Sequence, residues 1–248
     1  MNSRETSAVA SAPDAEALRP ACFVDSAHPA VAAFAARVAG GEPDPVRRAA
    51  LLYYAVRDEI LYDPYVDYGD VESYRASSVL ARGRGYCVGK AALLAAAARA
   101  AGLPARLAFA DVRNHLSTPR LRELVGTDLF IYHGIAELWL GGRWVKATPT
   151  FNLSLCEKFH IRPLDFDGHN DAILHPYDRD GRRHMEYVRD RGAFADVPVE
   201  TIMPAMRAAY PRLFARNRAG GDFAREAEAA AEPGESSAPS TKAPATSD

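Results

Sequence analysis

The sequence contains only three cysteines, Cys22, Cys87 and Cys156, and no two of them form a C-x-x-C pair. An odd number of cysteines without such a pair indicates neither a disulfide framework nor a thiolate zinc site. Each cysteine therefore needs its own explanation, and a lone cysteine is by default a small buried apolar residue. We expect this default role for Cys22 and Cys156.

The chain also lacks a charge imbalance and a long apolar run. Its formal net charge is -2 and its sequence pI is about 6.4, so it has no strongly basic character for binding nucleic acid. No stretch approaches the roughly 18 uninterrupted apolar residues of a membrane span, and no basic segment leads into an apolar run. We therefore expect a cytoplasmic protein that binds neither nucleic acid nor membranes. Nothing in the sequence indicates its oligomeric state.

Both ends of the chain are poor in large apolar residues. Residues 1–20 and 219–248 consist mainly of Ser, Ala, Glu, Asp and Pro, and such segments cannot bury enough apolar surface to offset the entropy lost on ordering. We expect both ends to be disordered. The intervening residues 21–218 contain no internal repeat and no Pro/Ser-rich linker, which predicts one domain.

Helical patterns dominate the first part of this domain. Asp44 and Pro45 are typical of a helix start, and the apolar spacing that follows predicts an amphipathic helix up to about residue 60. The run from Cys87 to Ala101 is apolar on nearly every face and predicts a buried helix, which Gly102 ends. A strand is expected at 105–112 and a final helix at 199–216. Because the helices precede mostly antiparallel strands, the predicted fold class is α+β.

The clearest strand pairing lies in "DLFIYHGIAELWLGGRWVKATPTFN", residues 128–152. Two strand-like runs are joined by Gly141 and Gly142, which readily adopt the positive φ angles of a two-residue turn. The turn fixes the register of the hairpin. The predicted cross-strand pairs are Leu140–Arg143, Trp139–Trp144, Glu137–Lys146, Ile135–Thr148 and His133–Thr150.

Cys87 stands at the first turn of the predicted buried helix. Unpaired backbone N–H groups and the positive end of the helix dipole both favour a thiolate there, which makes Cys87 a candidate nucleophile. Gly85 is expected to let a substrate approach the sulfur. A thiolate nucleophile needs a proton acceptor, and among the seven histidines we favour His133 because it lies on a well-defined strand.

These residues together resemble the transglutaminase-like superfamily of papain-fold thiol enzymes. The shared pieces are Gly85-Tyr86-Cys87, the phrase "AAGLPARLAFADV", the histidine strand, and "GGRWV" leading to Pro149-Thr150. The resemblance covers about residues 62–152. It implies a papain-like core in which the cysteine helix packs on an antiparallel sheet, with Cys87 as nucleophile and His133 as base.

The sequence departs from the family pattern at Thr148, where the family usually has an aspartate that orients the imidazole. The predicted register places Thr148 and Asn152 diagonal to His133, about 7 to 8 Å away between backbones. We favour Asn152 as the orienting residue, with Thr148 or a carboxylate such as Asp165 or Asp167 as alternatives.

The resemblance also implies an oxyanion site. The backbone N–H of Cys87 would hold the oxyanion together with an aromatic or amide side chain from the preceding segment. Tyr62 occupies the corresponding place in "EILYDP", and the alternative role for Tyr62 is a tyrosine of the core.

Three further motifs are incomplete. A phosphate-binding loop requires four residues between its glycines and a Ser or Thr after the lysine. "GYCVGKA" meets neither requirement. "DFDGHND", residues 165–171, lacks the glycine and glutamate positions of a calcium loop and predicts a surface turn. His169, His175 and His184 lack the spacing of a helical zinc motif. We expect no cofactor and no metal.

The expected function is acyl transfer through a thioester on Cys87, with His133 as base and then acid. Hydrolysis of a peptide or other amide is favoured over protein crosslinking, because water is always present as the acceptor. The alternative is a catalytically degenerate domain that binds or scaffolds, which the missing aspartate suggests.

Overall fold

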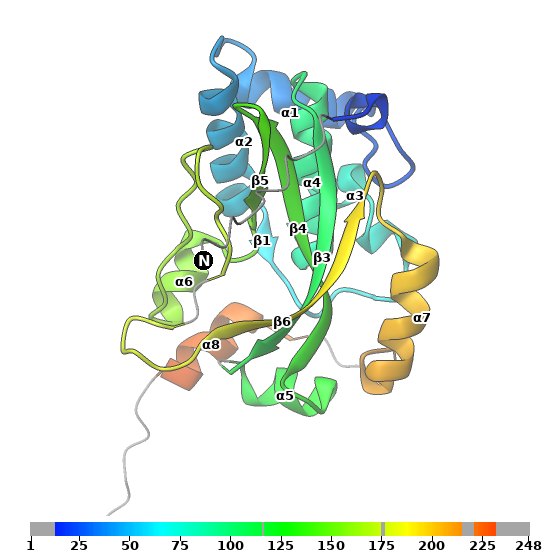
Figure 1. The fold of residues 1–248 in the computed structure, drawn as a ribbon. Coiled ribbons are helices and arrows are strands. Elements are labelled where there is room, and N and C mark those ends of the chain that lie inside the picture. Colours follow the sequence, from blue (N-terminus) through cyan, green and yellow to red (C-terminus); the bar gives the residue numbers. More distant parts are fainter. Residues whose placement is uncertain (1–12, 116, 175–176, 215–220, 232–248) are drawn as a thin grey trace, which may run out of the picture.

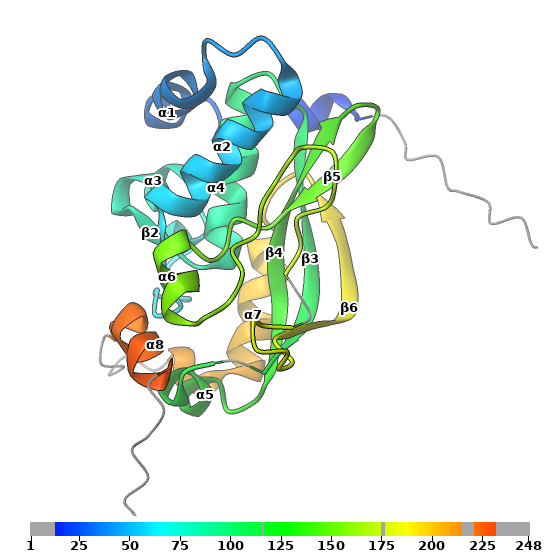
Figure 2. The ribbon, with the colours of Figure 1, turned by 90° about the vertical axis from the view of Figure 1, so that its left-hand side faces the viewer.

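The computed structural model describes residues 13–115, 117–174, 177–214 and 221–231. Other helices pack against one side of a central helix, and an antiparallel sheet covers its other side (Figures 1 and 2). The helical elements are η1 (Ala15–Leu18), α1 (Pro29–Ala39), α2 (Pro45–Glu59), η2 (Val71–Ser73), α3 (Ala76–Arg82), α4 (Cys87–Ala100), α5 (Pro119–Val125), α6 (Leu153–Lys158), α7 (Val199–Ala209), η3 (Pro211–Phe214) and α8 (Phe223–Ala231).

The strands form two separate sheets. They are β1 (Leu61–Tyr62), β2 (Arg84–Gly85), β3 (Ala105–Asn114), β4 (Leu129–Leu140), β5 (Arg143–Ala147) and β6 (Met185–Phe194). The main sheet has the order β5-β4-β3-β6 and every neighbouring pair in it is antiparallel. A short parallel pair joins β1 to β2 directly before α4. The predicted α+β class is confirmed.

The central helix α4 is buried along almost its whole length, as its apolar sequence predicts. Even Lys90 is fully buried, and its Nζ donates hydrogen bonds to the carbonyl oxygens of Arg57 (2.9 Å) and Ile60 (2.5 Å). These carbonyls lie at the end of α2, where backbone acceptors lack partners within the helix. Lys90 therefore fixes the end of α2, and the β1 strand that follows it, against α4.

The helices of the described residues include none with the length and apolar character of a membrane span.

The hairpin forms with the predicted turn, but its pairing is shorter than predicted. The pairs Leu140–Arg143, Trp139–Trp144 and Glu137–Lys146 are present, and pairing stops at Ala136–Ala147. The predicted Ile135–Thr148 and His133–Thr150 pairs are therefore wrong. The backbone N–H of Thr148 instead donates to the Ala172 carbonyl oxygen (2.9 Å), and Pro149 has no N–H with which to extend the ladder.

The C-terminal elements also differ from expectation. The predicted helix at 199–216 ends at Ala209, because Pro211 cannot continue it and begins η3 instead. Residues 185–194 form the ten-residue edge strand β6. Residues 215–216 of the expected helix lie outside the described residues.

Helix α8 lies within the segment that composition predicted to be disordered. The Phe223 ring packs against Tyr62 (centroids 5.5 Å apart) and Phe159 (5.5 Å). Glu226 accepts a hydrogen bond from the Thr118 hydroxyl (3.0 Å). The domain boundary predicted at residue 219 is therefore corrected. The average composition of the segment did not reveal that a single aromatic residue, Phe223, would be buried against the domain. In the same way, η1 lies inside the expected N-terminal tail, and residues 1–12 and 232–248 lie outside the described residues.

Candidate active site

Cys87 begins α4, and strand β4 crosses directly over this helix end. A Cβ atom built on Gly134 would lie 2.7 Å from the Cα of Val88, closer than packed atoms can approach. Only glycine therefore lets β4 come this near to the start of α4. Because Gly134 directly follows His133 in the chain, this contact brings the strand that carries the imidazole to the helix that carries the sulfur.

The surroundings of the Cys87 sulfur act on its pKa in opposite directions. Burial raises the pKa of the thiol to about 11, while the backbone N–H groups of Gly134, Val88 and Cys87 lower it. The N–H groups of Cys87 and Val88 are the unpaired donors expected at a helix start, and the N–H group of Gly134 comes from β4. They do not outweigh the desolvation of a charged sulfur, so the expected resting thiolate is not what this site favours.

His133 lies in the same pocket and is also neutral at rest. Burial lowers the pKa of its imidazole to about 4. Its Nε2 atom is buried and has no hydrogen-bond partner among the described residues. The described residues show no hydrogen bond between the imidazole and the Cys87 sulfur. The pair is therefore a thiol and a neutral imidazole at pH 7.

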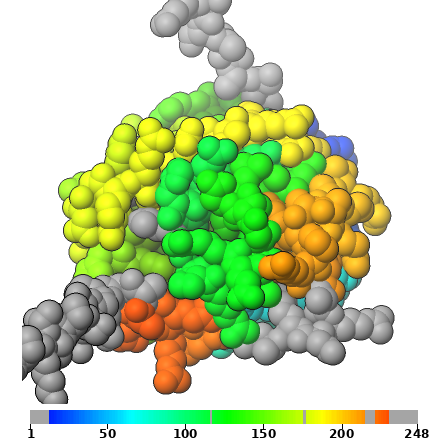
Figure 3. All heavy atoms as spheres, turned by 90° about the horizontal axis from the view of Figure 1, so that it is seen from below, coloured from blue at the N-terminus to red at the C-terminus, as the bar shows by residue number. Residues whose placement is uncertain are grey.

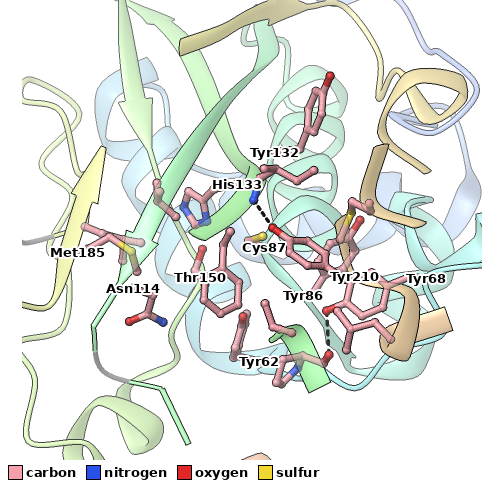
Figure 4. A pocket seen from close by; sticks show the side chains of 18 of the residues that line it. Tyr62, Tyr68, Tyr86, Cys87, Asn114, Tyr132, His133, Thr150, Met185 and Tyr210 are labelled. Carbon is pink, nitrogen blue, oxygen red and sulfur yellow. Dashed lines mark hydrogen bonds between the residues drawn. The ribbon is translucent and has the colours of Figure 1, made fainter. Parts of the chain in front are cut away.

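The pocket around these two side chains is mainly apolar and aromatic, and its cavity volume is about 50 Å³. Figure 4 shows the Cys87 sulfur and the His133 ring on its wall, with Thr150 and Tyr62 close by. No lining residue in the described part of the chain is Asp, Glu, Lys or Arg.

The lower face of the molecule, where α5 lies between α8 and α7, is shown in Figure 3.

Tyr62 lines this pocket from β1. It pairs with Gly85 of β2, two residues before the nucleophile candidate, and its ring packs edge-on against Phe151 (4.9 Å). Burial, and in second place the nearby Cys87, raise the pKa of the Tyr62 hydroxyl well above its usual value. The hydroxyl is therefore protonated and can donate a hydrogen bond at neutral pH.

Gly85 has a different role from the one expected. A Cβ atom at this position would lie 2.9 Å from a methyl group of Val79, so the space beside Gly85 is filled by α3. Gly85 is not among the residues that line the pocket. The glycine permits close packing and does not admit a substrate.

Asn152 does not serve as a partner of the imidazole. Its Oδ1 accepts a hydrogen bond from the backbone N–H of Tyr62 (3.0 Å), and its Nδ2 donates to the Ser154 hydroxyl (2.8 Å). Both ends of the amide are thus occupied at the start of α6. The preference for Asn152 as orienting residue rested on strand pairing that does not form. In the structure, Asn152 holds the backbone of Tyr62 through a hydrogen bond.

Among the described residues, no hydrogen bond joins any of the alternative orienting residues to the imidazole. The Thr148 hydroxyl is buried and has no hydrogen-bond partner in the described part of the chain. Asp165 lies near Arg57 (3.7 Å) and is largely exposed. Asp167 accepts the backbone N–H groups of the following turn, which is the surface turn predicted for residues 165–171.

Thr150 is the polar residue of this segment that lines the pocket, next to Phe151. Its hydroxyl is buried without a partner among the described residues, as is Nε2 of His133. Two buried polar groups without partners in one pocket are expected to bind water or a polar substrate group. Sequence reasoning placed Thr150 opposite His133 but assigned it no role.

The other cysteines and histidines complete the comparison. Cys156 is buried as expected, whereas Cys22 is exposed, which corrects the expectation for that residue. No group of three or more metal-ligating side chains gathers in the described residues. His175 lies outside the described residues.

Strand β4 is bulged directly before His133. Ala110 of β3 pairs with His133 and Val112 pairs with Phe130, so that Ile131 and Tyr132 together oppose a single residue. Tyr132 has a φ of 55°, a left-handed conformation that is unusual for an aromatic residue. No motif in the sequence signals this bulge.

Residues 32–149 match the transglutaminase-like superfamily. The chain therefore carries a transglutaminase-like core. The matched region contains Cys87, His133 and Thr148 and ends before Asn152.

Solved structures that are similar to this protein include two from bacteria. A candidate cysteine protease from Cytophaga hutchinsonii is 15% identical with a TM-score of 0.47, and the match covers 75% of this chain and 48% of that one. A candidate protease from Parabacteroides distasonis is 16% identical with a TM-score of 0.35, covering 50% of this chain and 23% of that one. This chain thus spans less than half of either protein. No curated protein matches it.

Proposed function

We propose that this protein hydrolyses an amide or peptide bond through a thioester on Cys87. The observation that carries the proposal is that the Cys87 sulfur, at the start of a buried helix, faces three backbone N–H groups in a pocket that His133 also lines. The match to the transglutaminase-like superfamily supports the same chemistry. Water is favoured over an amine as the final acceptor, as the sequence suggested.

The reaction begins with a neutral pair. As the sulfur of Cys87 attacks the carbonyl carbon, His133 takes the thiol proton, and the carbonyl oxygen gains the negative charge. The protonated Tyr62 hydroxyl is a donor for that oxygen. The carbon–nitrogen bond then breaks, and the imidazolium returns its proton to the leaving amine. Water then attacks the thioester carbon while His133 accepts its proton. The carbon–sulfur bond breaks, the carboxylic acid leaves, and the imidazolium returns the proton to the Cys87 sulfur.

The pocket wall indicates the kind of acyl group that would bind. Its described residues offer apolar and aromatic contacts such as Met185, Met206 and Phe130, and they offer no charged partner. A charged substrate group would lose its hydration without compensation. The acyl group next to the reacting carbonyl is therefore expected to be uncharged and apolar.

The second candidate is a domain that binds such a group without chemistry. The observation that favours it is that burial holds both Cys87 and His133 neutral, while the imidazole has no orienting partner among the described residues. A covalent-labelling experiment separates the two candidates.

The experiment measures acylation by p-nitrophenyl hexanoate, which is neutral and apolar. Released nitrophenolate is followed at pH 7 and the acylated cysteine is located by mass spectrometry. We expect a burst with one acyl group on Cys87. The burst should vanish in Cys87→Ala and slow by about 10²-fold or more in His133→Gln, while Cys156→Ala should behave as wild type.

The proposal is overturned if no acyl group appears on Cys87, or if His133→Gln is as fast as wild type. Absence of acylation, combined with binding of a non-reactive apolar amide, would support the binding domain instead. Among reactive esters, p-nitrophenyl succinate, which carries a negative charge, should acylate Cys87 at least about 10-fold more slowly than the hexanoate.

A further inference from the structure

The bulge before His133 is held by side chains on both neighbouring elements. Because Ile131 and Tyr132 oppose only Asp111, their backbone N–H groups drop out of regular strand pairing. The N–H of Tyr132 donates to Oδ1 of Asp111 (3.1 Å), and the N–H of Ile131 donates to the hydroxyl of Tyr210 (2.7 Å). Both freed groups are thus satisfied by specific buried side chains.

Asp111 also connects β3 to β6 through an ion pair. Arg191 of β6 binds both of its carboxylate oxygens, with distances of 2.7 to 3.0 Å. Arg191 itself is an extra residue in β6, because Phe109 pairs with Gly192 and Ala110 pairs with Asp190. Bulges in β4 and β6 therefore lie at the same level on either side of β3. The Arg191 guanidinium additionally lies 4.6 Å from the centre of the Tyr132 ring.

Tyr210 anchors the bulge from α7. Besides accepting from Ile131, its hydroxyl donates to the carbonyl oxygen of Leu129 (2.8 Å), and the side chain is almost fully buried. As a result, the four consecutive residues 130–133 all line the pocket. In a regular strand alternate residues face opposite sides, so the bulge places residues from both sides there.

We propose that Asp111 and Tyr210 are positioning residues that hold His133 in place through the backbone of the β4 bulge. The imidazole has no side-chain partner for Nε2 among the described residues, and the position that usually carries the orienting aspartate is Thr148. A left-handed Tyr132 costs conformational energy and persists only where surrounding contacts enforce it, as Asp111, Arg191 and Tyr210 do here. The inference rests on the proposed function, in which His133 is the base.

The test compares Asp111→Ala with Glu137→Ala. Glu137 is the matched control, because it is also a buried carboxylate that pairs with an arginine on the neighbouring strand, Arg106, away from the bulge. Acylation of Cys87 by p-nitrophenyl hexanoate at pH 7 needs His133, whereas alkylation by iodoacetamide at pH 10 does not. Both rates are measured per folded molecule.

Asp111→Ala should slow acylation about 10- to 100-fold, with the half-saturating ester concentration and the alkylation rate at pH 10 nearly unchanged. Glu137→Ala should change neither rate by more than about 3-fold. Tyr210→Phe, which removes one oxygen atom and is expected to fold, should slow acylation in the same selective way. The imidazole ¹⁵N signals of His133 should shift in Asp111→Ala and stay in place in Glu137→Ala.

Each outcome has a defined meaning. Equal acylation by wild type, Asp111→Ala and Tyr210→Phe would overturn the inference, as would an equal loss in Glu137→Ala. A parallel loss of acylation and alkylation would show general loosening of the site and would also overturn it. If wild type itself is not acylated, the proposed function fails, and the ¹⁵N signals alone then decide whether Asp111 positions the ring.

Discussion

The backbone N–H of Gly134 is directed at the sulfur of Cys87 and lowers the pKa of its thiol. One residue of β4 thus contacts the nucleophile candidate while its neighbour His133 supplies the base candidate. The contact depends on the missing side chain of Gly134, since a Cβ atom there would lie 2.7 Å from Val88. The close contact between Gly134 of β4 and Val88 of α4 therefore sets the relative position of the strand, the helix and both candidate reactive groups.

Gly134→Ala should separate β4 from α4. We expect a loss of about 1 to 3 kcal/mol in the free energy of unfolding, since overpacking a dense core costs this much, and a slower acylation of Cys87. Urea denaturation measures the first effect. Gly41→Ala is the control, because a Cβ atom at Gly41 meets nothing within 4 Å, and equal stability losses in the two variants would contradict the role of Gly134.

The pH dependence of cysteine alkylation should reveal the neutral resting pair. With a Cys87 pKa of about 11, the thiolate fraction at pH 7 is only about 10⁻⁴. Iodoacetamide should therefore label the exposed Cys22 before Cys87 at pH 7, and the rate at Cys87 should climb steadily above pH 9. Mass spectrometry of the labelled peptides measures both rates. A plateau for Cys87 near neutral pH would mean that a thiolate–imidazolium pair exists at rest.

Asn152→Ala should weaken the fold and leave the proton chemistry alone. The variant leaves the Tyr62 N–H without its acceptor, which should reduce the free energy of unfolding by about 1 to 3 kcal/mol. The acylation rate should keep the wild-type shape of its pH profile, decreasing only as the pH falls towards the His133 value of about 4. Ser154→Ala, which loses only the other end of the amide, serves as the milder control. A displaced acid limb in Asn152→Ala would restore this residue as the orienting partner.

Lys90 should make the protein more stable as the pH rises above neutral. Burial lowers the pKa of Lys90 from 10.5 to about 7, so between these values the unfolded chain binds a proton that the folded chain does not. From pH 7 to 8, below the pKa of about 8.5 of a free thiol, the free energy of unfolding should increase by about 1 kcal/mol. Lys90→Met should flatten this rise, as measured by denaturation at several pH values. An unchanged slope would show that Lys90 is charged in the fold.

The features that sequence reasoning predicted correctly depend on residues close together in the chain. Asp44 caps α2 through the N–H of Val46 (2.9 Å), and Gly141 and Gly142 have the positive φ values the turn requires. The apolar run after Cys87 identifies a buried helix, because no face of it is suited to water.

The features that were missed depend on partners far along the chain. Asp111 and Arg191 are eighty positions apart, and neither shows in its own neighbourhood that the two will bind. Asn152 similarly reaches back ninety positions to Tyr62. The loss of β4–β5 pairing after Ala147 arises from competition with residue 172, which no local pattern reveals. The setting of His133 is therefore determined by tertiary contacts, whereas its choice as the candidate base rests on the sequence.

The seating of Phe223 against Tyr62 has a practical consequence for anyone preparing fragments of this protein. A polypeptide that ends at residue 218 would keep every strand of the main sheet, yet it would lack the Phe223 ring that packs against Tyr62 of the pocket. Loss of activity in this fragment would then reflect a missing packing contact and not a missing reactive group. A fragment that ends at residue 231 keeps the contact.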